Sequence, residues 1–159
     1  MMQLVLGLDL GTSGVRTAVL NRNGELLHSR STNYSRGLDQ SQDWQTACSS
    51  LITEIPESLR QRLAAIAVDG TSGTLLPCTR DGHALGPALL YSEACPEQAR
   101  QLARLVPDGC PAASPSGSLA RALRLLERHP QLELLRHQAD WINGWLLQDW
   151  RWGEEGNNL

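Results

Sequence analysis

Residues 7–16 read Gly7-Leu8-Asp9-Leu10-Gly11-Thr12-Ser13-Gly14-Val15-Arg16. An apolar run ends at Asp9, and a tight turn of two glycines and two hydroxyl residues leads into a second apolar run. Small residues let backbone N–H groups approach an anion closely, and Thr12 and Ser13 add side-chain donors. Asp9 can hold a divalent cation through water, because Mg²⁺ keeps several waters in such sites. The alternative interpretation is a plain hairpin turn that needs its glycines.

The segments around this turn predict an antiparallel meander. Residues 3–9 and 15–21 are apolar runs, and residues 25–31 follow after Asn23-Gly24, a dipeptide typical of a type I′ hairpin turn. Three strands joined by tight turns are therefore expected at the start of the chain.

The next segment has the spacing of a helix. Apolar residues recur three and four positions apart over residues 41–55, which is typical of a helix with one apolar stripe. Ser41 is expected to cap this helix, and Pro56 is expected to end it. The stripe consists of Trp44, Ala47, Cys48, Leu51, Ile52 and Ile55.

A second hydroxyl-rich loop follows an unbroken apolar run. Residues 63–68 predict a strand that is buried on both faces, and they lead into Asp69-Gly70-Thr71-Ser72-Gly73. Ligands of α/β sheets gather at strand ends, so two such loops can converge on one cleft. Hydroxyls and carboxylates in that cleft suit a polyhydroxylated substrate and a phosphate. An ordinary turn remains the alternative for this loop.

The second half of the chain is mostly helical. Short strands are expected at residues 74–78 and 88–91, and helices at 96–105, at 118–129 and from a cap at Asp140. On the 118–129 helix, Leu119, Ala122, Leu123 and Leu126 are expected to face inward. Trp141 and Trp145 are expected in a core, and Arg121, Arg124 and Arg128 on a solvated helix face. This element order predicts an α/β fold with a mixed sheet rather than a doubly wound dinucleotide fold.

Composition excludes several classes of protein. The chain has 159 residues and a net charge of −3, which argues against a nucleic-acid partner because such binding needs clustered cations. All 14 basic residues are arginines, so no Walker-type lysine is present. Neither a membrane-length apolar run nor a signal peptide is evident, which predicts a cytoplasmic protein with no membrane partner. The cysteines are irregularly spaced and are expected to be free, mostly buried thiols; they are Cys48, Cys78, Cys95 and Cys110.

Residues 7–16 resemble the first phosphate motif of the superfamily that includes sugar kinases and actin. Within it, the chain resembles the N-terminal part of an FGGY-family carbohydrate kinase. The supporting motifs are Asp43-Trp44, Val68–Thr74, His137–Trp141 and Gly153–Leu159. The last two motifs are similar to the plant and cyanobacterial xylulokinase-like group, which suggests D-ribulose as substrate.

This resemblance implies a ribonuclease H-like mixed sheet with flanking helices, and transfer of a phosphoryl group from ATP to a pentulose, D-ribulose or D-xylulose. The implied cofactors are ATP and Mg²⁺. Residues expected to face the phosphates and the metal are Asp9, Gly11, Thr12, Ser13, Gly14 and Arg16, with Asp9 holding the metal through water. Residues expected to border the sugar are Gly70, Thr71, Ser72 and Glu93.

The chain departs from the family pattern in three respects, the first being that Gly153-Glu154-Glu155-Gly156 differs from the family's Ser-Asp-rich approach to the Asn pair. Residues 91–95 stand where the family has aromatic-x-Asp-x-Arg, so that Glu93 replaces the Asp and Cys95 replaces the Arg. The general-base Asp of the family lies beyond residue 159, so no catalytic residue is expected here. Residues 1–159 are therefore interpreted as a truncated N-terminal kinase domain without its C-terminal domain, inactive alone. The alternatives are a non-catalytic sugar- or phosphate-binding remnant and half of a split kinase, partnered by the missing half or by self-association.

Overall fold

A computed structural model describes residues 3–156 of the chain. The chain divides into two compact units, one up to Gly70 and one from Thr71 onward. Each unit is described by itself below.

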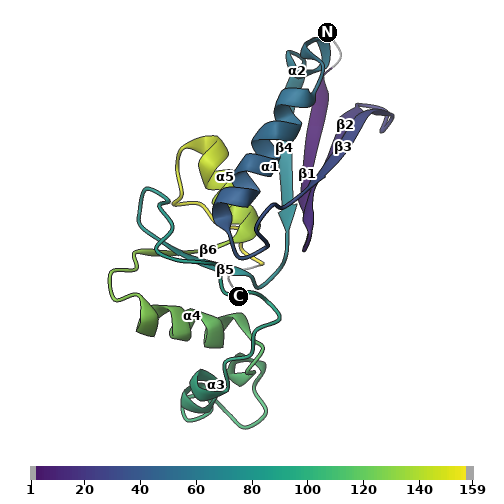
Figure 1. Cartoon of the computed structure of the whole chain (residues 1–159). Coiled ribbons are helices and arrows are strands. Elements are labelled where there is room, and N and C mark those ends of the chain that lie inside the picture. Colours follow the sequence, from purple (N-terminus) through teal and green to yellow (C-terminus); the bar gives the residue numbers. More distant parts are fainter. Residues whose placement is uncertain (1–2, 157–159) are drawn as a thin grey trace. The chain divides into compact units, whose positions relative to one another are not determined.

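The first unit is built on a four-stranded mixed sheet (Figure 1). Its strands are β1 (Leu4–Leu10), β2 (Gly14–Asn21), β3 (Leu26–Asn33) and β4 (Leu63–Gly70). The order is β3-β2-β1-β4, with β1 antiparallel to β2, β2 antiparallel to β3, and β4 parallel to β1. The predicted meander and the mixed sheet are confirmed. The turn before β3 differs from the prediction, because Gly24 alone has a positive φ, of 79°, whereas a type I′ turn needs two such residues.

Helix α1 (Ser41–Glu54) packs against one face of this sheet, where it contacts β2 and β3. Alternate residues of β1 are buried, as expected for a strand with one covered face. All but one member of the predicted helical stripe are buried, and Ile52 is half-buried. Ser41 is the first helical residue rather than the cap, which is Gln40. Pro56 ends the helix as predicted and precedes the single turn α2 (Glu57–Arg60).

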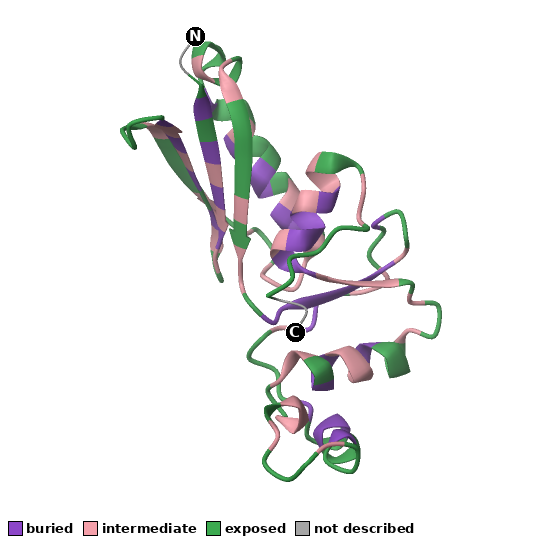
Figure 2. Cartoon of the chain, turned by 180° about the vertical axis from the view of Figure 1, so that it is seen from behind, coloured by how far each residue is buried: buried purple, intermediate pink, exposed green. Residues whose placement is uncertain are grey.

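Strand β4 forms as predicted, but its predicted burial on both faces is wrong. Most of its residues are exposed, as the green colour of this strand in Figure 2 shows. The strand lies at an edge of the sheet, with β1 as its neighbour on one side. An unbroken apolar run indicates only that a strand can be buried, whereas the segments that cover it decide whether it is.

The second unit contains a two-stranded antiparallel sheet between helices (Figure 1). Its elements are β5 (Leu75–Cys78), α3 (Pro96–Leu102), η1 (Pro111–Ala113), α4 (Ser118–Arg128), β6 (Leu134–His137) and α5 (Gln138–Leu147). Helix α4 packs against β5, and α5 packs against both strands. The core of this unit joins the sheet to α3 and α4 and consists of Leu75, Leu89, Cys95, Leu102, Ala120 and Leu125.

Several predictions for this unit need correction. Residues 88–91 form only an isolated bridge, between Leu75 and Leu89, and strand β6 was not predicted. Asp140 lies in the first turn of α5, whereas the cap is His137. Trp141 is buried as predicted, and Trp145 is half-buried.

Helix α4 is rotated relative to the predicted orientation. Leu119 and Leu126 are 46% and 49% exposed, although both were expected to face inward. Ala122 and Leu123 pack against the core as half-buried residues. Arg121 was expected on the solvated face, but it is only 3% exposed. Arg121 is buried because its guanidinium donates hydrogen bonds to main-chain carbonyls inside the unit.

The cysteine prediction is confirmed. All four thiols are free, and Cys48, Cys78 and Cys95 are buried. Burial raises the pKa of Cys48 to about 12 and that of Cys78 to about 11, so neither thiol ionises near neutral pH. Among residues 3–156, no helix is both long enough and apolar enough to cross a membrane.

Candidate functional site

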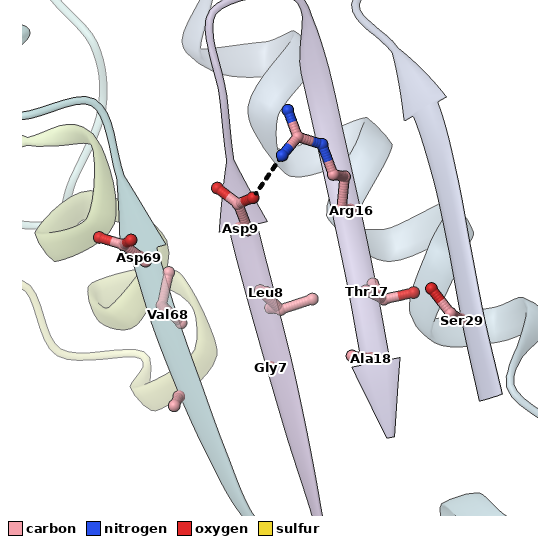
Figure 3. Close-up of a pocket in the computed structure, with 10 residues that line it drawn as sticks. Gly7, Leu8, Asp9, Arg16, Thr17, Ala18, Ser29, Val68 and Asp69 are labelled. Atoms are coloured by element: carbon pink, nitrogen blue, oxygen red, sulfur yellow. Dashed lines mark hydrogen bonds and ion pairs between the residues drawn. The ribbon is translucent and has the colours of Figure 1, made fainter. Parts of the chain in front are cut away.

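The parallel strands β1 and β4 bring two carboxylates side by side. Asp9 pairs with Asp69, and Leu10 pairs with Gly70, at the carboxyl ends of both strands. Figure 3 shows both carboxylates at the same end of the sheet. The two strands therefore end side by side in one sheet, whereas convergence of the two loops on one cleft stays a prediction. Asp69 was not assigned a role from the sequence, although its position directly after an apolar strand matches that of Asp9.

Asp9 forms an ion pair with Arg16 on β2. Arg16 Nη1 lies 3.0 Å from Asp9 Oδ2, and the two residues are cross-strand partners (Figure 3). The Asp9 side chain is 49% exposed and the Arg16 side chain 69%, so the pair is screened by water and contributes little to stability. Exposure also leaves Asp9 accessible to an incoming ligand.

The carboxylate oxygens at the carboxyl ends of β1 and β4 suit a hydrated Mg²⁺. Asp69 Oδ1 accepts a hydrogen bond from the Gly70 backbone N–H at 2.9 Å, and Asp9 Oδ2 accepts from Arg16. Among the described residues, no hydrogen bond is made by the second oxygen of either carboxylate. Carboxylate oxygens in contact with solvent are the ligands that Mg²⁺ accepts while it keeps several waters. Asp9 and Asp69 would hold the ion.

The turn between β1 and β2 is closed by its own backbone. The Gly11 N–H donates to the Gly14 carbonyl at 2.9 Å, and the Tyr34 N–H donates to the Ser13 carbonyl at 2.9 Å. Thr12 and Ser13 are exposed, and within residues 3–156 their hydroxyls make no hydrogen bond. The turn therefore presents two hydroxyl groups to solvent.

Packing requires glycine at only one of the two glycine positions of this turn. A Cβ on Gly14 would lie 2.1 Å from the Thr32 carbonyl oxygen, so the close approach of β3 requires glycine there. A Cβ on Gly11 would meet Arg16 Nη2 at 3.5 Å and the Gly14 carbonyl at 3.6 Å, which are ordinary contacts. The hairpin interpretation explains Gly14 but not Gly11.

A shallow groove runs along the sheet face opposite α1. Its volume is about 450 Å³, and small residues contributed by adjacent strands form its floor. They are Gly7, Ala18, Ser29 and Ala67. Asp9, Arg16 and Asp69 line its polar end (Figure 3).

The second hydroxyl loop continues into the second unit at Thr71. The Thr71 N–H and hydroxyl donate to Gln138 Oε1 at 2.9 and 2.8 Å, and the Thr71 and Thr74 hydroxyls lie 2.9 Å apart. Gln138 is fully buried, so it anchors the loop rather than facing solvent. Ser72 is exposed.

Glu93, the remaining residue expected to border a sugar, lies on an exposed turn of the second unit. Its Oε1 accepts a hydrogen bond from the Leu90 N–H at 3.2 Å, which closes the turn. Its carbonyl accepts from Arg121 Nη1 at 3.3 Å, and the Gly73 carbonyl accepts from Arg121 Nε at 2.9 Å. The two predicted sugar-bordering segments of this unit are therefore joined through one side chain.

Comparison with solved structures gives a consistent group of kinases, whereas no family model matches the chain. A xylulose kinase from Rhodospirillum rubrum superposes with a TM-score of 0.77 at 19% identity. A kinase from Brucella ovis titled xyloylose kinase gives 0.76 at 17%, and the glycerol kinase of Plasmodium falciparum, solved with ADP, gives 0.72 at 13%. Each match covers 90% of this chain and 34% of the other chain.

These similarities establish the fold. The chain has the mixed α/β, actin-like fold that makes up one portion of each of these sugar kinases. The predicted ribonuclease H-like fold class is therefore confirmed. It spans about a third of the length of these kinases. The activity of a whole kinase is therefore a proposal for this chain.

Proposed function

We propose that this chain is the N-terminal part of an FGGY-type carbohydrate kinase that transfers the γ-phosphoryl group of ATP to a hydroxyl of a pentulose. Residues 1–159 would supply the phosphate-facing turn and part of the sugar site. The general base and the nucleotide pocket would come from a further segment or a second chain.

The observation that carries this proposal is the pairing of β1 with β4. This pairing sets Asp9 beside Asp69, and both hydroxyl loops follow directly after these paired strands. The fold is shared with sugar kinases. Phosphoryl transfer depends mainly on positioning and on electrostatic stabilisation, and this end of the sheet combines carboxylates for a cation with donors for phosphate oxygens.

The residues divide between two ligands. Asp9 would orient a water of the Mg²⁺ shell, and the hydroxyls of Thr12 and Ser13 would donate to phosphate oxygens. The backbone at Gly11 and Gly14 would approach the phosphates closely, and Arg16 would add a positive charge after it leaves Asp9. Mg²⁺, when bound, neutralises charge that develops on the phosphates.

The sugar would lie against the second loop. Gly70 lets a ligand approach the backbone, Ser72 can donate and accept, and Glu93 can accept from a sugar hydroxyl. Thr71 would act by holding the loop, because its hydroxyl is engaged by Gln138. The Ser72 hydroxyl and the Glu93 carboxylate can each pair with a sugar hydroxyl, which favours a polyol, and the sequence motifs favour D-ribulose over D-xylulose.

Titration of the isotope-labelled chain, followed by backbone amide NMR shifts, tests this proposal. We expect D-ribulose to shift Gly70–Gly73 and Mg·ATP to shift Gly11–Gly14, with D-xylulose weaker than D-ribulose. If neither ligand moves either loop at millimolar concentration, the proposal is wrong.

A coupled ADP assay on the same sample distinguishes a kinase part from a complete enzyme. We expect no sugar-dependent turnover, because loss of a general base alone costs about 10²–10⁴-fold. ADP release at about 1–100 s⁻¹, the usual range of kinases, would contradict the assignment of the base to another segment.

A further inference from the structure

Arg121 is a buried cation that binds main-chain carbonyls rather than a carboxylate. It lies in the first half of α4 and is 3% exposed. Its Nε donates to the Gly73 carbonyl at 2.9 Å, and its Nη1 donates to the carbonyls of Tyr91 and Glu93 at 3.0 and 3.3 Å. A guanidinium is a rigid planar fork, so these bonds fix the three carbonyls relative to one another.

Gly73 and Arg121 fit each other sterically as well. Gly73 has a φ of 80°, and a Cβ on it would lie 2.7 Å from Arg121 Nη2. The guanidinium therefore occupies the space that a side chain at position 73 would need. Glycine is therefore needed at position 73 for two reasons. It adopts the positive φ of this turn, and its lack of a side chain leaves room for the guanidinium.

Tyr91 is held at both ends of its backbone. Its N–H donates to the Thr74 hydroxyl at 3.3 Å, and its carbonyl accepts from Arg121. The Thr74 side chain is fully buried and lies 2.9 Å from the Thr71 hydroxyl. The loop at 71–74 and the turn at 91–93 therefore form one hydrogen-bonded assembly, with Arg121 at its centre.

Neighbouring arginines of α4 lack this arrangement. Arg124 is half-buried, and its Nη1 reaches the Ala94 carbonyl at 3.5 Å and Cys95 Sγ at 3.8 Å, both long contacts. Arg128 is exposed. The difference shows that burial of Arg121 does not follow from the charge pattern of the helix but from the acceptors that it meets.

We propose that Arg121 is a positioning residue for sugar binding, which sets the Thr71–Gly73 loop against the Tyr91–Glu93 turn so that Ser72 and Glu93 address one polyol. This inference rests on the proposed function. Arg121 acts through the backbone of both segments and is not itself a catalytic residue. A polyol that contacts both segments binds well only if their spacing is held before it arrives, since otherwise binding must order them.

Two variants of the full chain test the inference, with Arg128→Gln as the matched control at an exposed position of the same helix. Arg121→Gln removes the charge and the fork. Arg121→Lys keeps the charge but cannot donate along the directions of a planar fork. For each variant the dissociation constant for D-ribulose, amide hydrogen exchange at residues 72–75 and 90–94, and the melting temperature are measured.

We expect Arg121→Gln to raise the dissociation constant at least about tenfold, the scale of one lost charge-assisted hydrogen bond, and Arg121→Lys to raise it about three- to tenfold. Exchange should rise in both segments together, whereas Arg128→Gln should change neither the dissociation constant nor the exchange rates. If Arg121→Gln does not fold, the lysine variant decides the matter.

A dissociation constant within twofold of the unmodified chain in a folded Arg121 variant overturns the inference, even if exchange rises, because the residue would then be structural only. If the unmodified chain binds no D-ribulose, the proposed sugar site is wrong and the positioning role is overturned with it. The two failures are distinct, because the second is seen before any substitution is made.

Discussion

The two hydroxyl loops have nearly the same sequence but are held in different ways. Gly11-Thr12-Ser13-Gly14 is closed by its own backbone and by the adjacent strand, and it presents both hydroxyls to solvent. The 71–73 segment is held by side chains from α4 and α5, which come 48 and 67 residues later in the chain. One loop is therefore a local hairpin turn, whereas the other depends on tertiary contacts.

This difference suggests different uses. A turn with exposed donors and a nearby carboxylate can receive a charged ligand without rearrangement. A loop fixed by distant elements can hold a precise spacing for a neutral ligand with several hydroxyls. The predictions below break or sharpen this contrast, starting with the largest effect.

Asp9→Asn should give the largest loss. It keeps the shape of the side chain and removes the charge that would hold hydrated Mg²⁺. In an enzyme completed by fusion to the remaining two thirds of a xylulose kinase, we expect kcat to fall at least about 10²-fold, the scale for one lost transition-state stabiliser. Asp108→Asn, on an exposed loop of the second unit, is the control. An unchanged rate would reduce the first loop to a plain hairpin turn.

Gly14→Ala and Gly11→Ala should separate folding from binding within the first loop. The Cβ on Gly14 would overlap the Thr32 carbonyl, and overpacking typically costs about 1–3 kcal/mol of unfolding free energy. Gly11→Ala meets only ordinary contacts and should leave stability nearly unchanged while it weakens Mg·ATP binding. Denaturant unfolding and nucleotide titration measure the two effects. Equal destabilisation by both variants would mean that the turn is purely structural.

Ser72→Ala and Ser13→Ala should act on different ligands. Loss of one neutral hydrogen bond predicts that Ser72→Ala weakens D-ribulose binding by about 0.5–1.5 kcal/mol and leaves nucleotide binding unchanged. Ser13→Ala should do the reverse. Calorimetric titration of each variant with each ligand gives the answer. If Ser72→Ala weakens nucleotide binding and spares the sugar, the ligands are assigned to the wrong loops.

The smallest effect on the two loops at neutral pH is expected from the contacts of Asp43. These contacts are close to the first loop, and their loss is expected only in acid. The Asp43 carboxylate accepts hydrogen bonds from the Arg36 N–H and from Arg36 Nε at 2.9 Å. These bonds, the backbone bond above all, lower the pKa of Asp43 from 3.8 to about 2. The stabilisation is therefore complete above the unfolded-state pKa and is lost as the pH falls through about 2.

Acid should thus loosen residues 34–37 and, through the bond between the Tyr34 N–H and the Ser13 carbonyl, the first loop before the second. Amide NMR signals followed from pH 5 to pH 2 report both loops, and Asp43→Asn should remove the difference. Simultaneous loss of signal in both loops would contradict this prediction.

Much of the first unit was predictable, because its elements are encoded by short-range patterns. The apolar runs at 3–9 and 15–21 and the three-four spacing in α1 placed these elements within one or two residues of their observed bounds. The placement of both strands in one sheet was also anticipated. By contrast, the exposure of β4 and the existence of β6 were missed, since a short apolar run does not reveal which segments will cover it or pair with it.

Local order along the chain, by itself, determined the strands around Gly11–Gly14, the apolar stripe of α1 and the presence of two hydroxyl-rich loops after apolar runs. Only the tertiary structure decided that Asp69 stands beside Asp9, that Gly14 but not Gly11 is needed for packing, and that Arg121 is buried against the Gly73 carbonyl. The physical reason is that periodicity reports how a segment meets its own neighbours. Strand register, close backbone approach and burial of a charge depend instead on partners that the fold brings from elsewhere in the sequence.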